Sequence, residues 1–284
     1  MTGNGFDRDA WLMRILYAGP LAPTLETLRG LVFSQAHAIA YESLDITLGR
    51  VPKLGVPELQ RKMVDHQRGG YCFELNMLFR AGLRSLGYRV TSLQGRVVRG
   101  MAIDAPRPAI HMLLQVELPQ GPYLADVGFG NLAPTAPLVL APHVEQPTPH
   151  GLMRFIEVNG ELTLQQLLGQ RWEHIYRVIP YPRYDAEYEV ANWYTATHPD
   201  APYPNNMIAA RPLPDGSRLT MFNDRVTLRA SSGESHRRNL ETPEAFAAVL
   251  REEFALAVPD RDLYRMLQVV EQRGTRGAPH PFFA

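Results

Sequence analysis

The sequence predicts an α+β fold in which a helical first third is followed by a strand-rich middle and a mixed C-terminal portion. Three observations lead to this prediction. Apolar residues recur at helical spacing through the first third, and the spacing changes to every second residue from Tyr88 onward. The 24 prolines cluster beyond residue 100, which indicates a loop-rich second half.

The first third contains the signals of four helices. They are expected at residues 7–18 before Gly19-Pro20, after the cap Thr24, from Pro57 to about Asp65, and from Cys72 to the stop at Gly87. Residues 45–48 alternate in a short pattern typical of a strand.

The middle of the chain contains short strands separated by turn signals. Strands are expected at residues 88–98, 110–118, 123–127, 154–158, 161–168, 172–180 and 188–194, with a proline-rich loop over 133–149. The Asn159-Gly160 pair is a strong hairpin signal, and several short strands with regular turns favour a barrel.

The last portion mixes both element types. We expect a hairpin of residues 218–223 and 225–230, a helix opened by Thr242-Pro243, and a final helix capped by Asp260 and ended by Gly274. The tail, residues 275–284, either packs through Phe282 and Phe283 or is disordered.

The composition excludes several classes of protein. Lys plus Arg and Asp plus Glu each number 29, so the chain has no net positive charge that would favour binding to nucleic acid or to an anionic membrane. A single cysteine excludes an intrachain disulfide and a cysteine-based zinc cluster, and it fits a reducing compartment. The N-terminal pattern is not that of a signal peptide, and no apolar run approaches the ~18 residues of a membrane span. We therefore expect a soluble cytoplasmic protein.

The stretch of residues 68–76 contains the only cysteine. Cys72 follows the pair Gly69-Gly70 and begins an amphipathic run, so we expect it in the first turn of a helix, where backbone N–H groups favour its thiolate. A helix N-terminus contributes roughly 0.3–1 kcal/mol, and one pKa unit is about 1.36 kcal/mol, so the helix lowers the thiol pKa by less than one unit. A fully ionised nucleophile therefore needs a second cation, usually a histidine. The local sequence is equally consistent with Cys72 as a small buried hydrophobic residue that takes no part in chemistry.

His111 and Asp126 are the candidate partners of this cysteine. His111 is the polar residue that opens an apolar strand, and Asp126 ends another apolar strand, where a buried carboxylate needs a partner. A turn centred on Gln120-Gly121 would place Asp126 opposite Gln115 and leave His111 about 13 Å away on the same face, at about 3.4 Å per residue. A direct pair would need a turn centre near Leu118-Pro119, or a bulge. The other histidines include His143, His150, His236 and His280, whose polar or proline-rich surroundings place them at the surface.

Several motifs together resemble the arylamine N-acetyltransferase family. They are Arg68-Gly-Gly-Tyr-Cys-Phe-Glu74, the strand histidine His111, Asp126-Val-Gly-Phe-Gly130, His37 with Tyr41-Glu-Ser-Leu44, and Asn192-Trp-Tyr-Thr-Ala-Thr-His-Pro199. The order and spacing hold from residue 6 to about 230. The family usually shows Phe-Glu-Asn-Leu where this chain has Tyr41 to Leu44, and neither changed position carries the chemistry.

The resemblance implies a Cys72–His111–Asp126 triad on a cysteine-protease-like core. It implies an N-terminal helical domain at 1–88, a β-barrel domain at 89–205 and an α/β lid at 206–284. The activity would be ping-pong transfer of acetyl from acetyl-CoA, with no permanently bound cofactor, to aromatic amines and hydrazines, by a monomer or homodimer.

The resemblance also assigns roles to residues around the triad. Phe129 would form an aromatic wall for the acceptor ring, although a barrel core residue is the alternative, and Gly128 and Gly130 would let the CoA pyrophosphate approach backbone amides. The neutral net charge gives no sign of a phosphate site. Arg68 and Glu74 would brace the site through ion pairs.

Three other functions fit parts of the pattern. An amide synthase that closes a macrolactam from a carrier-protein thioester would share the fold and the triad. A cysteine hydrolase or transglutaminase-like enzyme would share the order Cys, His, Asp. A binding module with a structural cysteine would predict that Cys72→Ala leaves function unchanged.

Overall fold

Capping residues set the starts of the N-terminal helices in the computed structural model, which describes residues 5–273. The Asp7 carboxylate accepts the Ala10 N–H at 3.0 Å at the start of α1, and Thr24 Oγ1 accepts the Thr27 N–H at 3.2 Å at the start of α2, as predicted for Thr24. The helical elements of this part are α1 (Arg8–Arg14), α2 (Leu25–Ala38), α3 (Leu44–Thr47), α4 (Val56–Leu59), its π-helical continuation η1 (Gln60–Asp65), and α5 (Cys72–Ser85). Gly87 follows α5 at φ +87°, in keeping with its predicted role as a stop.

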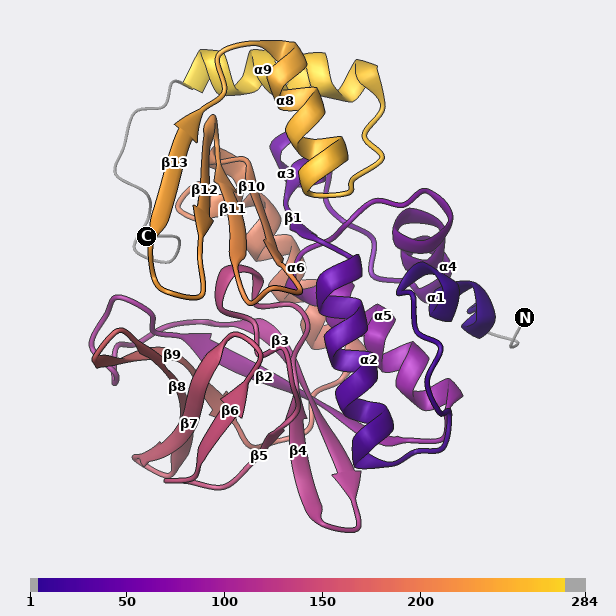
Figure 1. Cartoon of the computed structure of the whole chain (residues 1–284), viewed down its shortest axis with the longest axis vertical. Coiled ribbons are helices and arrows are strands. Elements are labelled where there is room, and N and C mark those ends of the chain that lie inside the picture. The colour runs from indigo at the N-terminus through magenta and orange to yellow at the C-terminus, as the bar shows by residue number, and fades with distance from the viewer. Residues whose placement is uncertain (1–4, 274–284) are drawn as a thin grey trace.

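A nearly closed eight-stranded sheet forms the lower half of the molecule (Figure 1). Its strand order is β5-β4-β3-β2-β9-β8-β7-β6. The strands are β2 (Arg89–Val97), β3 (Ala109–Leu118), β4 (Gly121–Ala125), β5 (Leu138–Val139), β6 (Glu145–Thr148), β7 (Gly151–Val158), β8 (Glu161–Leu168) and β9 (Arg171–Ile179). The Gln146 side chain joins the two edge strands, since it accepts the Val139 N–H at 2.7 Å and donates to Val139 O at 3.0 Å.

The strand β3 separates two cores because its side chains alternate between its faces. Met112, Leu114 and Val116 pack with the helices, whereas Leu113 belongs to the core inside the barrel-like sheet. His111 has the same parity as Leu113, so it belongs to the barrel-side face.

A second, five-stranded sheet has the order β1-β10-β11-β12-β13. Its strands are β1 (Tyr41–Glu42), β10 (Ile208–Pro212), β11 (Arg218–Phe222), β12 (Arg225–Arg229) and β13 (Ser235–Asn239). Helices α8 (Pro243–Ala248), its π-helical continuation η3 (Val249–Glu253) and α9 (Asp260–Arg273) lie beside it (Figure 1). The edge strand β1 comes from the N-terminal portion, so the first and last parts of the chain share this sheet.

Several predicted elements were wrong. Residues 45–48 lie largely in helix α3, and the predicted loop at 133–149 contains β5 and β6. The first helix ends at Arg14, and Asp260 is the first residue of α9, not the residue that caps it. His150 is buried because it packs between elements from three parts of the chain.

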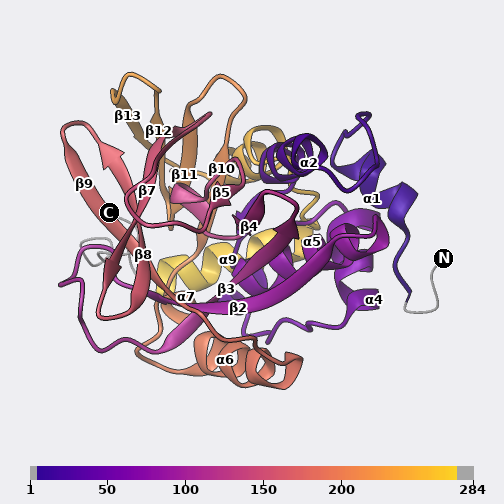
Figure 2. The ribbon, with the colours of Figure 1, turned by 90° about the horizontal axis from the view of Figure 1, so that it is seen from below.

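The predicted strand at 188–194 was also wrong, because these residues belong to α6 (Asp185–Thr197), which α7 (Pro202–Asn205) follows. Figure 2 shows α6 on the outside of the molecule, beside β2 and β3 of the eight-stranded sheet, and the Tyr188 hydroxyl on α6 donates to Leu93 O on β2 at 2.8 Å. Tyr188, Ala191, Asn192 and Thr195 are buried at the spacing of a helix face, which outweighs the strand preference of this composition.

The predicted helix stop at Gly274 and the predicted tail at 275–284 lie outside the described residues. Within residues 5–273, no helix is both long and apolar enough to span a membrane.

Candidate active site

Cys72 is the first residue of α5, and close backbone packing holds the segment before it. Glu42 N–H donates to Gly70 O at 3.0 Å, and Gly70 N–H donates to Ala40 O at 3.3 Å, so the glycine pair lies against β1. A Cβ on Gly69 would lie 2.2 Å from Ala40 O, which only glycine avoids. The Tyr71 N–H donates to the Glu74 carboxylate at 3.1 Å, which caps the first turn of α5.

The hairpin β3–β4 brings His111 and Asp126 together. Leu118 pairs with Gly121, so the turn is centred on Pro119-Gln120 and not on Gln120-Gly121, and the predicted separation of about 13 Å is wrong. In this register Asp126 would fall opposite Leu113, one residue beyond the end of β4 and on the same face of the sheet as His111. The His111 Nε2 to Asp126 Oδ2 distance is 2.7 Å.

Four groups surround the buried Asp126 carboxylate. Oδ2 contacts His111 Nε2 and accepts the Tyr176 hydroxyl at 2.9 Å, and Oδ1 accepts Asn76 Nδ2 at 3.0 Å and the Gly128 N–H at 2.9 Å. Burial alone would raise the pKa of Asp126, but the charge and hydrogen bond of His111, with the other donors, hold it below its ordinary value. The carboxylate is therefore ionised, and its contact with Nε2 fixes the orientation of the His111 ring.

Asn76 and Tyr176 are residues of the site that sequence reasoning missed. Asn76 is fully buried one helical turn after Cys72, where it donates to Met112 O at 2.7 Å and accepts the Val127 N–H at 3.1 Å. The sequence offered one signal for Asn76, because it is a polar residue four positions after Cys72 on an otherwise apolar helix face. Tyr176 comes from β9, and nothing in the sequence connects it with Asp126.

Cys72 and His111 line one small cavity. Its volume is about 30 Å³, and its lining also includes Tyr41, Phe129 and Tyr203. Because Nε2 of His111 contacts Asp126, Nδ1 is the ring nitrogen available to the thiol. Burial raises the pKa of the Cys72 thiol, the opposite of the lowering expected from the helix N-terminus. The buried position of Cys72 therefore favours the neutral thiol.

The loop of residues 126–130 packs directly against the start of α5. A Cβ on Gly128 would lie 2.9 Å from both Cys72 Cα and Cys72 O, and 2.6 Å from Asn76 Nδ2. Gly130 has φ +73°, which favours glycine. Phe129 meets the His111 ring edge-on at 5.0 Å between centroids and belongs to the barrel core, so it both packs there and lines the cavity.

Arg68 and Glu74 belong to a buried ion cluster beneath the site. Arg68 Nη2 lies 2.8 Å from Glu42 Oε1, while Lys62 Nζ lies 2.8 Å from Glu74 Oε1 and 2.7 Å from Asp45 Oδ2. Burial, opposed by Lys62 and reinforced by Glu42, raises the pKa of Glu74 to about 7. The cluster ties the N-terminus of α5 to β1 and η1. Among the described residues, no group of His, Cys, Asp and Glu side chains is arranged to hold a metal ion.

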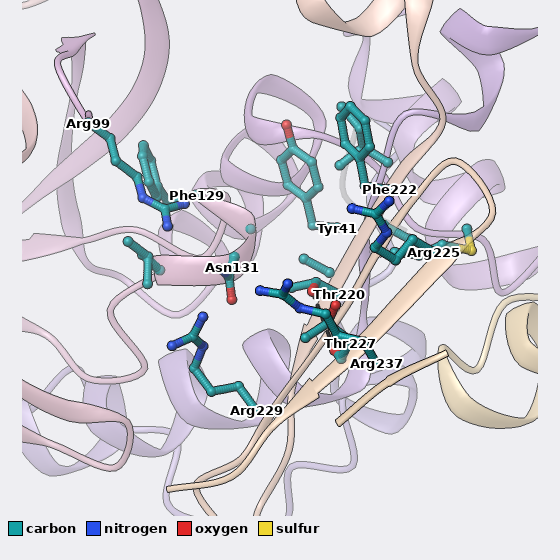
Figure 3. Close-up of a pocket in the computed structure, with 16 residues that line it drawn as sticks. Tyr41, Arg99, Phe129, Asn131, Thr220, Phe222, Arg225, Thr227, Arg229 and Arg237 are labelled. Atoms are coloured by element: carbon teal, nitrogen blue, oxygen red, sulfur yellow. Dashed lines mark hydrogen bonds between the residues drawn. The ribbon is translucent and has the colours of Figure 1, made fainter. Parts of the chain in front are cut away.

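A second cavity of about 220 Å³ adjoins the first, and Tyr41 and Phe129 line both. Arginines reach it from the barrel side (Arg99) and from β12 and β13 of the five-stranded sheet (Arg225, Arg229 and Arg237), as Figure 3 shows. The guanidinium groups of Arg225, Arg229 and Arg237 form no hydrogen bond or ion pair with any residue in the described range. The neutral total charge thus conceals a local cationic pocket suited to phosphate.

Comparison with known proteins defines the class. A family model described as N-acetyltransferase matches residues 24–263. The chain is 36% identical over 250 residues to the arylamine N-acetyltransferase of Escherichia coli K12, covering 88% of this chain and 89% of the relative. It is 37% identical over 258 residues to that of Mycobacterium tuberculosis H37Rv, covering 89% and 90%.

Solved structures agree with the sequence comparisons. The Mycobacterium marinum arylamine N-acetyltransferase in complex with CoA matches with a TM-score of 0.87 and 34% identity, covering 93% of this chain and 99% of that chain. The Salmonella typhimurium arylamine N-acetyltransferase matches with a TM-score of 0.88 and 31% identity, covering 94% and 99%. The protein is therefore an acyltransferase. It belongs to the arylamine N-acetyltransferase family.

Proposed function

We propose that the protein transfers the acetyl group of acetyl-CoA to the nitrogen of aryl amines and arylhydrazines through an acetyl-Cys72 intermediate. The observation that carries this proposal is the position of Cys72 and His111 on one cavity wall, with Asp126 at 2.7 Å from His111. Nucleophilic catalysis requires a thiol, a base and a residue that orients the base.

In the first half-reaction the Cys72 thiol gives its proton to His111 Nδ1. The thiolate attacks the carbonyl carbon of the thioester, and the backbone N–H of Cys72, in the first turn of α5, donates to the developing oxyanion. The intermediate then expels the CoA thiolate, which takes the proton from His111. Cys72 is left as an acetyl thioester.

In the second half-reaction an aryl amine attacks the acetyl-Cys72 carbonyl. Such an amine is weakly basic and so neutral at pH 7, and it gives a proton to His111 as the new C–N bond forms. The second tetrahedral intermediate expels the Cys72 thiolate and releases the amide. The proton on His111 returns to Cys72, so the resting state is restored.

The arginine pocket supports a donor rich in phosphate. Three guanidinium groups without partners among the described residues line a cavity next to that of Cys72, and CoA carries three phosphate groups. The relative solved in complex with CoA supports the same donor. We propose that the thioester end reaches Cys72 past Tyr41 and Phe129 while the phosphates lie among the arginines, and that Phe129 contacts the acceptor ring.

We propose that each of three parts of the chain supplies different residues to the site. A helical unit at 1–88 supplies Cys72, a barrel unit at 89–205 supplies His111 and Asp126 in a cysteine-protease-like arrangement, and a lid at 206–284 supplies most of the arginines. The free thiol fits a reducing cytoplasm.

Initial rates measured over a grid of acetyl-CoA and aryl amine concentrations test the mechanism. We expect parallel double-reciprocal lines and no product with Cys72→Ala. Converging lines would indicate a ternary complex and contradict the acetyl-enzyme route. Release of acetate without amine would favour the hydrolase alternative.

A further inference from the structure

The cavity that contains Cys72 and His111 has a cation on its wall. Arg107 lines this cavity and is half-buried. Its guanidinium makes no hydrogen bond or ion pair with any residue between 5 and 273. A cation partly removed from water without a partner is costly, and an arginine fork matches a carboxylate. The position therefore suits an anionic group on a ligand.

The backbone that carries Arg107 is fixed in place. Arg96 Nη1 on β2 donates to Arg107 O at 2.6 Å, and Arg177 Nη2 on β9 donates to Ala105 O at 3.0 Å. The chain then enters β3 directly, and His111 follows four residues after Arg107. The Arg107 side chain thus extends from a loop whose backbone is held by these two hydrogen bonds, close in sequence to the candidate base His111.

The rest of the cavity wall is largely apolar. The apolar residues are Val97, Pro108, Ile110, Phe129 and Pro202. The hydroxyl of Tyr41 donates to that of Tyr203 at 2.7 Å. These walls match an aromatic ring in chemical character, and among the described residues that line them Arg107 is the only Lys or Arg.

An anion bound at Arg107 would be distinct from the CoA phosphates. The separate arginine pocket lies beyond Tyr41 and Phe129 and already offers Arg225, Arg229 and Arg237 to phosphate. An anion beside Arg107 belongs to the reacting end of a substrate.

We propose that Arg107 is a specificity-determining residue that recognises a substrate carboxylate, on the ring of the acceptor amine or on the acyl chain of the donor. This inference rests on the proposed function. Arg107 takes no part in bond formation. It favours substrates whose carboxylate lies against the loop before β3 while the reacting atoms lie between Cys72 and His111.

Paired substrates that differ in charge test this proposal. In the acceptor arm, kcat/KM is measured for 4-aminobenzoate and for the neutral 4-aminobenzamide, both with acetyl-CoA. In the acyl arm, malonyl-CoA is compared with acetyl-CoA, both with aniline. Each arm uses the wild type, Arg107→Gln and Arg107→Lys, with Arg29→Gln as the matched control, since Arg29 is exposed on α2 and lines neither cavity.

We expect Arg107→Gln to lower kcat/KM about tenfold for the anionic substrate of one arm and less than twofold for its neutral partner, because hydrogen bonds to charged groups contribute roughly 1.5–3 kcal/mol. Arg107→Lys should restore part of the loss, and Arg29→Gln should change nothing. A loss in the acceptor arm assigns the carboxylate to the amine, and a loss in the acyl arm assigns it to the acyl chain. Equal effects on charged and neutral substrates in both arms would overturn the proposal. Failure of the wild type to acylate any amine would instead refute the proposed function itself, and with it this inference.

Discussion

Gly128→Ala is expected to separate the Asp126 loop from the Cys72 helix. The added Cβ would lie 2.9 Å from both Cys72 Cα and Cys72 O, whereas ordinary contacts begin at 3.4 Å, so the backbones must move apart by about 0.5 Å. Overpacking of this kind costs roughly 1–3 kcal/mol of stability. Because a 1 Å misplacement reduces rates about 100-fold, we expect about tenfold slower acylation of Cys72.

The assay is the single-turnover rate of CoA release, with thermal denaturation measured in parallel. The control is Gly55→Ala, because the nearest atom to a Cβ at Gly55 is the flexible end of Glu58, and its φ of −62° suits any residue. We expect the control to retain wild-type acylation. If Gly128→Ala lost stability but acylated Cys72 at the wild-type rate, close packing of this loop would not be what sets the catalytic geometry.

Three further predictions follow from single side chains. Asn76→Ala removes a donor to Asp126 and leaves the Val127 N–H without its acceptor, so kcat should fall at least tenfold in steady-state assays, and an unchanged kcat would contradict its positioning role. Arg229→Gln should raise KM for acetyl-CoA several-fold, less so at high salt, and an unchanged KM would argue against the arginine pocket as the phosphate site. Burial, with Arg218 nearby, lowers the pKa of His150 to about 4, so between pH 6.5 and 4 the unfolded chain binds a proton that the folded chain does not. Urea denaturation should show the stability of the wild type falling across this window by on the order of 2 kcal/mol more than that of His150→Gln, allowing for partial solvent access; equal slopes would refute this.

Local signals predicted the elements whose ends depend on neighbouring residues. Thr24 and Thr242 cap α2 and α8 as expected, because capping involves residues only three positions apart. The strand predicted at 188–194 failed because its aromatic and β-branched composition favours a strand, while burial of one face against distant elements selects α6.

The candidate site also combines features that neighbouring residues decide with features that distant contacts decide. Cys72, His111 and Asp126 could be named from the sequence, but the distance between His111 and Asp126 could not, since the turn decides the register. Tyr176 contacts Asp126 across 50 residues of sequence. The arginine pocket brings together cationic side chains from separate segments, and the neutral net charge of the whole chain gives no sign of this local cluster. Contacts between distant segments are fixed by packing, which no local pattern encodes.

The acetyl-Cys72 intermediate is the central claim, and intact mass spectrometry tests it most directly. The purified protein is mixed with acetyl-CoA in the absence of amine, beside Cys72→Ala as a control. We predict one added acetyl group that maps to Cys72, is absent from the variant, and disappears when an aryl amine or hydrazine is added. Turnover of acetyl-CoA and amine by the wild type without any such adduct, or product formation by Cys72→Ala, would contradict the account.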